Sequence, residues 1–213
     1  MTLYCNFIYL YKYTQGNFMK KPATTAVKID ELIASRWSPR AFDPDFLIND
    51  EIIKALFEAA RWAPSCYGDQ PWKYILFNKQ DATAFSSALN CLSVGNQDWA
   101  MDASILILVC ANKYFNHNGE PNRFHQYDTG AASENICLQA SSINLSAHQM
   151  GGFDVQKAKE LADIPDEFEI LSFIAVGSIL DQSKMNESQK EREEAARKRK
   201  PLEEVYNINT WKK

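Results

Sequence analysis

The spacing of apolar residues predicts several helices separated by short strands. Apolar positions three and four residues apart predict a short helix over 29–35 and a longer helix from Asn49 or Asp50 to about Trp62. Ala63-Pro64-Ser65 ends this second helix, because Pro64 disfavours helical geometry in the residue before it. The same spacing predicts further helices over 81–89, 128–145 and 155–162.

Three apolar runs predict strands, at 74–77, 104–111 and 171–176. The middle run, SILILVCA, is continuously apolar, which is typical of a strand buried on both faces. A polar, asparagine-rich stretch over 112–126 is predicted to be a loop, long enough to act as a lid or a substrate loop. Few strands with much helix indicate an α+β (α/β-type) domain in which helices cover a small sheet.

Length, charge and cysteine content argue against a nucleic-acid-binding, membrane or metal-binding protein. The chain has 213 residues, enough for one domain with a continuous core. The net charge of −4 argues against a general nucleic-acid-binding surface. No apolar stretch reaches the roughly 20 residues that span a bilayer, so we expect no membrane partner. Five cysteines without CxxC spacing and three histidines without ligand spacing indicate a reduced, cytoplasmic protein without a metal site.

The first 18 residues are apolar and aromatic, but they lack the basic start and the cleavage site of a signal peptide. We expect translation to begin at Met19. Residues 1–18 are then an N-terminal extension, and residues 19–213 form a single domain with a polar C-terminal segment.

Two local motifs could carry chemistry. In the first, Arg36-Trp37-Ser38-Pro39-Arg40, two arginines flank a serine after a predicted helix. Guanidinium groups pair with phosphate through fixed forks of donors, and the serine hydroxyl adds another donor. The plain alternative is an exposed basic turn.

The second motif is the loop 63–72, APSCYGDQPW, between a helix and a strand. Gly68 can take backbone angles closed to other residues, and Gln70 offers a side-chain amide. Such a loop could present polar groups to a planar ring, or it could be a simple connection with a packed tryptophan.

These two motifs in this order resemble the nitroreductase family of flavoproteins. Downstream segments extend the resemblance in the same order, from residue 29 to residue 206: GNQDW at 95–99, DTGAA at 128–132, GGFD at 151–154, AVG at 175–177 and RKRKPLEEV at 197–205. The resemblance implies a nitroreductase-like fold, a mixed, mainly antiparallel sheet wrapped by helices in an interlocked homodimer, with FMN at the subunit interface. It also implies that the small-residue helix at 128–145 contacts the partner and that the C-terminal segment embraces it.

The resemblance also implies roles for individual residues. The arginines would lie near the FMN phosphate or its pyrimidine edge, the 64–68 loop would lie against the flavin from the other subunit, and Gly151 would offer its N–H to flavin N5. The implied cofactor contacts are Arg36, Trp37, Ser38, Arg40, Pro64, Ser65, Cys66, Gly68, Gln70, Asn96, Met150, Gly151, Gly152, Arg197 and Arg199. Gly68, Trp99 and Gly151 depart from residues common in the family, namely an asparagine, a lysine and an acid.

The activity implied is hydride transfer from NADH or NADPH to the flavin and then to a small-molecule electron acceptor, in a ping-pong reaction. Nitroaromatics, quinones and activated alkenes are all candidate acceptors. The flavin carries the hydride, so no side chain is expected to act covalently. The alternatives are a flavin-dependent dehalogenase or oxidase, a flavin-binding protein without turnover, and a binding domain without flavin.

Three other features have competing interpretations. Cys66 could be a nucleophile, although no paired histidine is evident. His125 and His148 could donate a proton to a substrate, or they could be ordinary surface or core histidines. The basic run 197–200 could bind nucleic acid, but the acidic residues around it argue against that.

Overall fold

A computed structural model describes residues 19–211, which fold around a four-stranded sheet with the order β1-β2-β4-β3. The strands are β1 (Trp72–Asn78), β2 (Ile105–Asn112), β3 (Ser146–Met150) and β4 (Phe168–Gly177). All three strand pairs are antiparallel, in agreement with the mainly antiparallel sheet that was expected. The proposed N-terminal extension, residues 1–18, lies outside the described residues.

Strand β2 occupies the centre of the sheet because both of its faces are apolar. Ile105 through Ala111 are all buried, and β2 pairs with β1 on one side and with β4 on the other. The pairing with β4 shifts register between Val109 and Cys110, which marks a bulge. The continuous apolar run of the sequence therefore identifies the central strand correctly.

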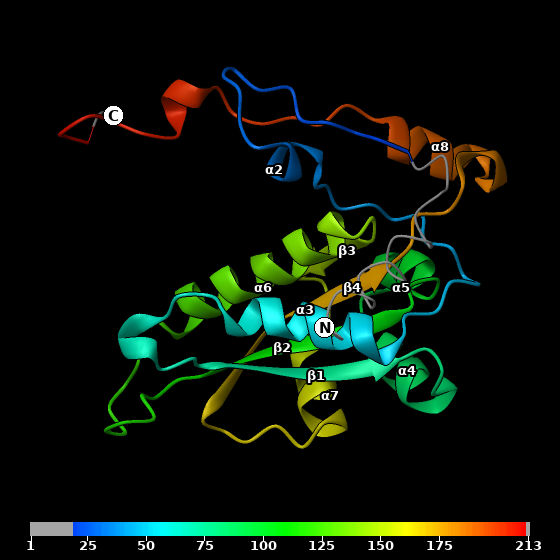
Figure 1. Cartoon of the computed structure of the whole chain (residues 1–213). Coiled ribbons are helices and arrows are strands. Elements are labelled where there is room, and N and C mark those ends of the chain that lie inside the picture. Colours follow the sequence, from blue (N-terminus) through cyan, green and yellow to red (C-terminus); the bar gives the residue numbers. More distant parts are fainter. Residues whose placement is uncertain (1–18, 212–213) are drawn as a thin grey trace, which may run out of the picture.

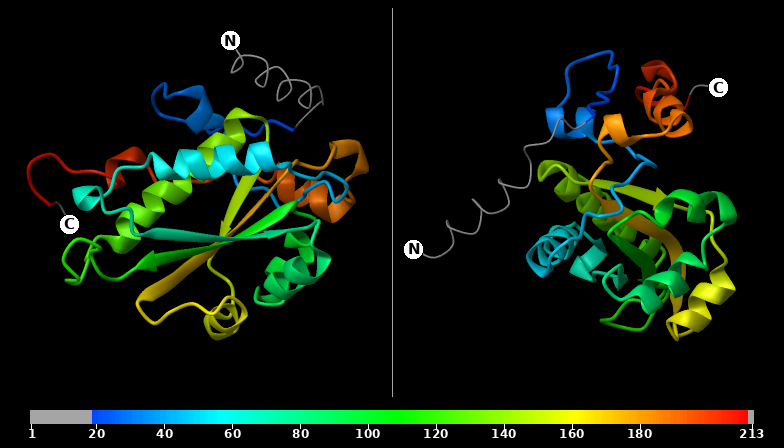
Figure 2. Two further views of the ribbon diagram at one scale, coloured as in Figure 1. Left: turned by 60° about the horizontal axis from the view of Figure 1, so that its bottom comes forward. Right: turned by 90° about the vertical axis from the view of Figure 1, so that its right-hand side faces the viewer.

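Helices cover both faces of the sheet (Figures 1 and 2). Helices α3 (Asp50–Arg61) and α6 (His125–Ser142) pack on one face, against a core cluster that includes Ile107 and Ile174. Helices α4 (Ala82–Leu89), α5 (Val94–Ala100) and α7 (Val155–Leu161) pack on the other face, against a cluster that includes Leu108 and Phe173.

An outer layer completes the fold beyond α6 (Figure 1). It contains the short helix α2 (Glu31–Ser35), helix α8 (Glu187–Glu194) and the C-terminal segment, with single 3₁₀ turns at Gln182–Lys184 and Leu202–Glu204. A third 3₁₀ turn, Cys66–Gly68, lies in the loop after α3. A small third cluster, which includes Trp37, Ala41, Ile179 and Met185, joins this layer to the main body.

The helix ends follow the sequence signals. The side chain of Asn49 accepts a hydrogen bond from the backbone N–H of Ile52, and that of Asp154 accepts one from Lys157, so both act as N-caps. Arg61 is the last residue of α3, close to the end expected before Pro64.

Some predicted boundaries were wrong and some elements were missed. Helix α6 begins at His125 and ends at Ser142, three residues earlier at both ends than predicted. Strand β3 and helices α5 and α8 were not predicted. Their sequences have weak periodicity, because β3 is short and polar in part and α8 is almost entirely charged.

Within residues 19–211, no helix is long and apolar enough to cross a membrane, and no cluster of three potential metal ligands occurs. Cys66, Cys91, Cys110 and Cys137 are all free thiols. Burial raises the pKa of the Cys110 thiol to about 11 and that of Cys137 to about 12. Both thiols therefore remain protonated at neutral pH and behave as core residues.

Candidate functional site

Arg36, Arg197 and Arg199, from two distant parts of the chain, lie in one neighbourhood. Arg36 follows α2, and its Nε lies 3.1 Å from Oε1 of Glu134 on α6, while its Nη1 lies 3.5 Å from Oγ of Ser38. Arg197 reaches back to the start of the described chain, where its Nη1 donates to the carbonyls of Lys21 and Ala34, each at 2.8 Å. The C-terminal segment is thereby held against α2.

The charges of this cluster act on one another. Burial lowers the pKa of Arg197, and the positive charges of Arg36 and Arg199 lower it further. Glu134 neutralises part of the cluster through Arg36. Arg197 and Arg199 keep the cluster positively charged, and the Ser38 hydroxyl is a further hydrogen-bond donor. Such a group of donors suits an anion that carries more than one negative charge.

Arg40 is held in place by a hydrogen bond of its backbone. Its N–H donates to a carboxylate oxygen of Glu193 at 2.7 Å. Glu193 is 3% exposed, and burial raises the pKa of its carboxyl group. This bond joins α8 to the 36–40 segment, and the Arg40 residue itself remains exposed.

His148 on β3 contacts the 36–40 segment. Its Nδ1 donates to the carbonyl of Pro39 at 2.8 Å, and its ring lies 4.5 Å from the ring of Trp99. Burial lowers the pKa of His148, so the imidazole is neutral at physiological pH. Neutral His148 holds the loop through one hydrogen bond and adds no charge beside the arginines.

A second group of predicted site residues surrounds the turn from β3 to α7. The Asn96 side-chain amide donates to the carbonyl of Gly152 at 3.0 Å. A Cβ on Gly152 would lie 2.8 Å from the Ser93 hydroxyl, so this position requires glycine. Gly151 is exposed with open space beside it, whereas the Met150 side chain is buried.

The third group, the loop after α3, lies at the N-terminal end of α6. The backbone N–H of Cys66 donates to the buried Asp128 carboxylate at 2.9 Å, and that of Gln70 donates to Oγ of Ser65 at 3.0 Å. Glu134, which holds Arg36, lies six residues further along α6, or roughly 9 Å at the rise of a helix. Within one subunit, therefore, this loop and the arginines occupy different parts of α6.

Comparison with known proteins identifies the family. The family model described as Nitroreductase family matches residues 33–178, more than half of the chain. The chain belongs to the nitroreductase family. The match begins before Arg36 and ends after β4, so it includes the 36–40 segment, the 64–70 loop and the 151–152 turn.

Individual relatives agree with this assignment. This nitroreductase-family chain is 26% identical to the oxygen-insensitive NADPH nitroreductase of Helicobacter acinonychis over 70% of its length and 87% of that protein. It is 27% identical to protein DrgA of Synechocystis, over 69% and 82% of the two chains. A solved structure described as an oxidoreductase containing FMN superposes with a TM-score of 0.81 at 33% identity, covering 89% of this chain and 96% of the other.

Two tryptophans in the family motifs are core residues here. Trp37 is 8% exposed and packs against Ala41, Ile179 and Met185, with the Lys21 ammonium 4.7 Å from its ring centre. Trp99, at the position where some members carry a lysine, is buried beneath His148. Trp37 therefore acts on the 36–40 segment through packing.

Sequence reasoning missed the acidic residues that organise the site. Glu134 and Glu193 lie in polar stretches, and their partners Arg36 and Arg40 are about a hundred residues or more away in the chain. No local pattern marks such pairs. His148 was considered as a proton donor or as an ordinary surface or core histidine, and its hydrogen bond to Pro39 could be found only in the fold.

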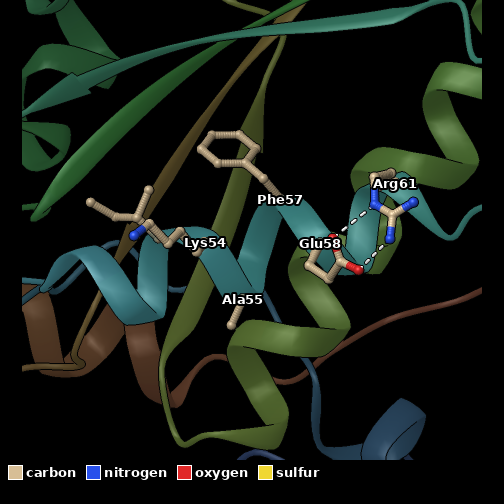
Figure 3. A pocket seen from close by; sticks show the side chains of 6 residues that line it. Lys54, Ala55, Phe57, Glu58 and Arg61 are labelled. Carbon is tan, nitrogen blue, oxygen red and sulfur yellow. Dashed lines mark hydrogen bonds and ion pairs between the residues drawn. The ribbon is translucent and has the colours of Figure 1, made fainter.

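A hollow lies along α3 (Figure 3), and none of its lining residues is a predicted site residue. Its lining is Ile53, Lys54, Ala55, Phe57, Glu58 and Arg61. Glu58 accepts hydrogen bonds from Arg61 and from the indole of Trp62, which lowers the pKa of Glu58 to about 2. Glu58 and Arg61 are thus paired with each other on the surface.

Proposed function

We propose that this protein is an FMN-dependent oxidoreductase that takes electrons from NADH or NADPH and passes them to small electrophiles such as nitroaromatics or quinones. The observation that carries the proposal is the cluster of Arg36, Arg197 and Arg199 beside Ser38. Family membership and the FMN-containing structural relative support the same activity.

The donor set fits the phosphate of FMN. A phosphate monoester carries close to two negative charges at neutral pH and three acceptor oxygens. Arg36 contacts Glu134 through Nε and Ser38 through Nη1, so Nη2 and the second hydrogen of Nη1 would donate to phosphate oxygens. Arg197 and Arg199 supply further positive charge from the C-terminal segment.

The glycine turn fits a planar ring. Open space beside Gly151 would allow a flat ligand to approach the backbone, and Gly152 and Asn96 fix the turn from behind. A glycine at this position offers a backbone N–H without a side chain in the way.

A homodimer would complete the site. The 64–70 loop is separated from the arginines along α6 of its own subunit, so in our proposal the loop lies on the flavin bound by the partner. Large apolar side chains of the C-terminal segment support this arrangement, because they are exposed in a single subunit: Leu202, Val205, Tyr206, Ile208 and Trp211. Burial against a second copy would remove that surface from water.

The chain would act by binding and orientation. Bound FMN supplies hydride transfer at N5. Arg36, Arg197 and Arg199 would hold the phosphate, and the Gly151 N–H would lie opposite the reacting edge. NAD(P)H and the oxidant would occupy the same open face in turn, which gives ping-pong kinetics. We further propose that the protein is cytoplasmic, in keeping with its free thiols.

The test is an absorbance spectrum of the purified protein before and after anaerobic addition of NADPH or NADH. We expect bands near about 370 and 450 nm that bleach on reduction. Protein that takes up no FMN on reconstitution would overturn the proposal. Flavin that binds but never bleaches with either nucleotide would instead indicate a binding protein without turnover.

A further inference from the structure

The peptide bond between Pro39 and Arg40 is held at both of its polar groups. Its carbonyl oxygen accepts a hydrogen bond from Nδ1 of His148 at 2.8 Å, and its N–H donates to Oε1 of Glu193 at 2.7 Å. The C=O and N–H of a trans peptide point in opposite directions, so the two side chains reach this peptide from opposite sides. His148 lies on β3 in the sheet and Glu193 on α8 in the outer layer (Figure 1). One peptide plane thus joins the sheet to the outer layer.

This peptide lies between the two exposed polar residues of the 36–40 segment. Along residues 37–41, buried and exposed positions alternate: the odd-numbered residues are buried, and Ser38 and Arg40 are exposed. Alternation with a period of two is typical of an extended chain. A rotation of the peptide before Arg40 would change the direction in which the Arg40 side chain leaves the backbone. Fixing this one peptide therefore fixes the starting direction of the Arg40 side chain.

Each of the two partners is itself held in place. The ring of His148 lies 4.5 Å from the buried ring of Trp99, which in turn lies 6.1 Å from the ring of Phe42. On the other side, Met185, two residues before α8, is buried in the third core cluster, and Glu193 is 3% exposed. Side chains that are packed in this way can impose an orientation on the peptide that they contact.

Stability alone is a poor explanation for these two contacts. A carboxyl group loses its water on burial, and this desolvation offsets much of the energy of its hydrogen bond. Burial raises the pKa of Glu193 and lowers that of His148, so both side chains are held against their charged forms. The N–H and C=O of a surface segment can be satisfied by water. Orientation of the segment therefore explains the two buried partners better than stability does.

We propose that His148 and Glu193 are positioning residues that clamp the Pro39–Arg40 peptide and thereby direct the Arg40 guanidinium toward bound FMN. The inference rests on the proposed function, in which FMN binds beside the 36–40 segment. The two residues act through Arg40 and not on FMN themselves. A long side chain has less conformational freedom to lose on binding when its backbone is already fixed, so the clamp raises the affinity for FMN.

The experiment measures the Kd of the full chain for FMN by quenching of flavin fluorescence, on variants that urea denaturation shows to be folded. His148→Phe keeps a ring but loses the donor, and Glu193→Met keeps the volume but loses the acceptor. In each we expect the Kd to rise about fivefold, because a contact that orients Arg40 is gone.

Two conservative variants and one control sharpen this test. His148→Asn keeps an N–H donor and Glu193→Gln keeps an oxygen acceptor, so both should bind FMN within about twofold of wild type. Glu191→Ala removes an exposed carboxylate from the same helix and should also stay within about twofold.

Arg40→Ala shows whether the clamp acts through Arg40. We expect this variant to bind FMN about tenfold more weakly, because a charged donor is lost. Adding His148→Phe or Glu193→Met to Arg40→Ala should weaken binding by less than about a further twofold, because the side chain that the clamp directs is gone.

Several outcomes would overturn the inference while leaving the proposed function intact. Losses that persist in full in the Arg40→Ala background, or that are as large in the conservative variants, would show a general structural role for the two residues. Wild-type affinity in His148→Phe, Glu193→Met or Arg40→Ala would show that the residue concerned does not serve FMN binding. Wild-type protein that takes up no FMN would overturn the proposed function itself.

Discussion

The central strand β2 and the arginine-bearing outer layer are built in opposite ways (Figure 1). Seven consecutive residues of β2 are buried, and both of its edges are paired with neighbouring strands. The 36–40 segment alternates between buried and exposed positions, residues 197–199 are not buried, and both segments are held by a few polar contacts such as that of Arg40 with Glu193. Stability should therefore depend mainly on the sheet, and ligand binding mainly on the outer layer.

The largest effect on stability should come from a truncation in β2. Leu108→Ala removes a fully buried side chain from the cluster beneath α4 and α7, and we expect the free energy of unfolding to fall by about 3 kcal/mol. Urea denaturation measures this change. The affinity of the folded variant for FMN should stay within about twofold, and a large loss of affinity would mean that the two regions are not independent.

The largest effect on binding should come from the arginine cluster. Arg197→Ala removes a guanidinium that contacts two backbone carbonyls and lies near Arg36. Loss of about 2 kcal/mol from charge-assisted contacts would weaken FMN binding roughly 30-fold.

Quenching of flavin fluorescence at fixed salt measures this affinity. Lys198→Ala is the matched control, because it removes the adjacent exposed positive charge, and its affinity should change less than about threefold. An equal loss in both variants would indicate attraction by net charge alone.

A smaller effect should follow from removing the carboxylate that holds Arg36. In Glu134→Ala the Arg36 side chain loses its partner at 3.1 Å and becomes mobile, so we expect FMN binding to weaken about fivefold. Riboflavin lacks the phosphate and should bind the variant as well as it binds wild type. A gain in FMN affinity would show instead that Glu134 competes with the phosphate.

The smallest effect concerns the pH dependence of the free energy of unfolding, through Glu169 beside the N-terminal end of α6. The side-chain amide of Gln126 and the imidazole of His125 both contact the Glu169 carboxylate and lower its pKa below the usual value near 4.5. Because the folded state favours the ionised form, this contribution is present above pH 4.5 and is lost as the pH falls through the lower folded pKa.

Glu169 is partly exposed, so we expect Glu169→Gln to cost less than about 1 kcal/mol at neutral pH. Urea denaturation at several pH values should show the difference from wild type shrinking below pH 4.5. A difference that stays constant over this range would exclude the ionised carboxylate as its source.

The sequence predicts the elements with strong local patterns and misses those that depend on distant partners. Strand β2 and helix α3 were correct because burial on one or both faces leaves a clear periodicity. Strand β3 was missed because it is short and includes His148 and Gln149, whose side chains find partners on Pro39 and on α6. The arginines of the candidate site are predicted from their motifs, whereas their acidic partners could be found only in the folded chain.

The contacts of the arginine cluster also determine when the candidate phosphate site can form. The two hydrogen bonds of Arg197 join residues 163 and 176 positions apart in sequence, and the bond from Arg40 to Glu193 spans 153 positions. All four strands lie between residues 72 and 177, so they are synthesised before Arg197 and Arg199. Capture of FMN through this cluster would therefore follow formation of the sheet, and a chain truncated before Arg197 would contain a complete sheet without a complete anion site.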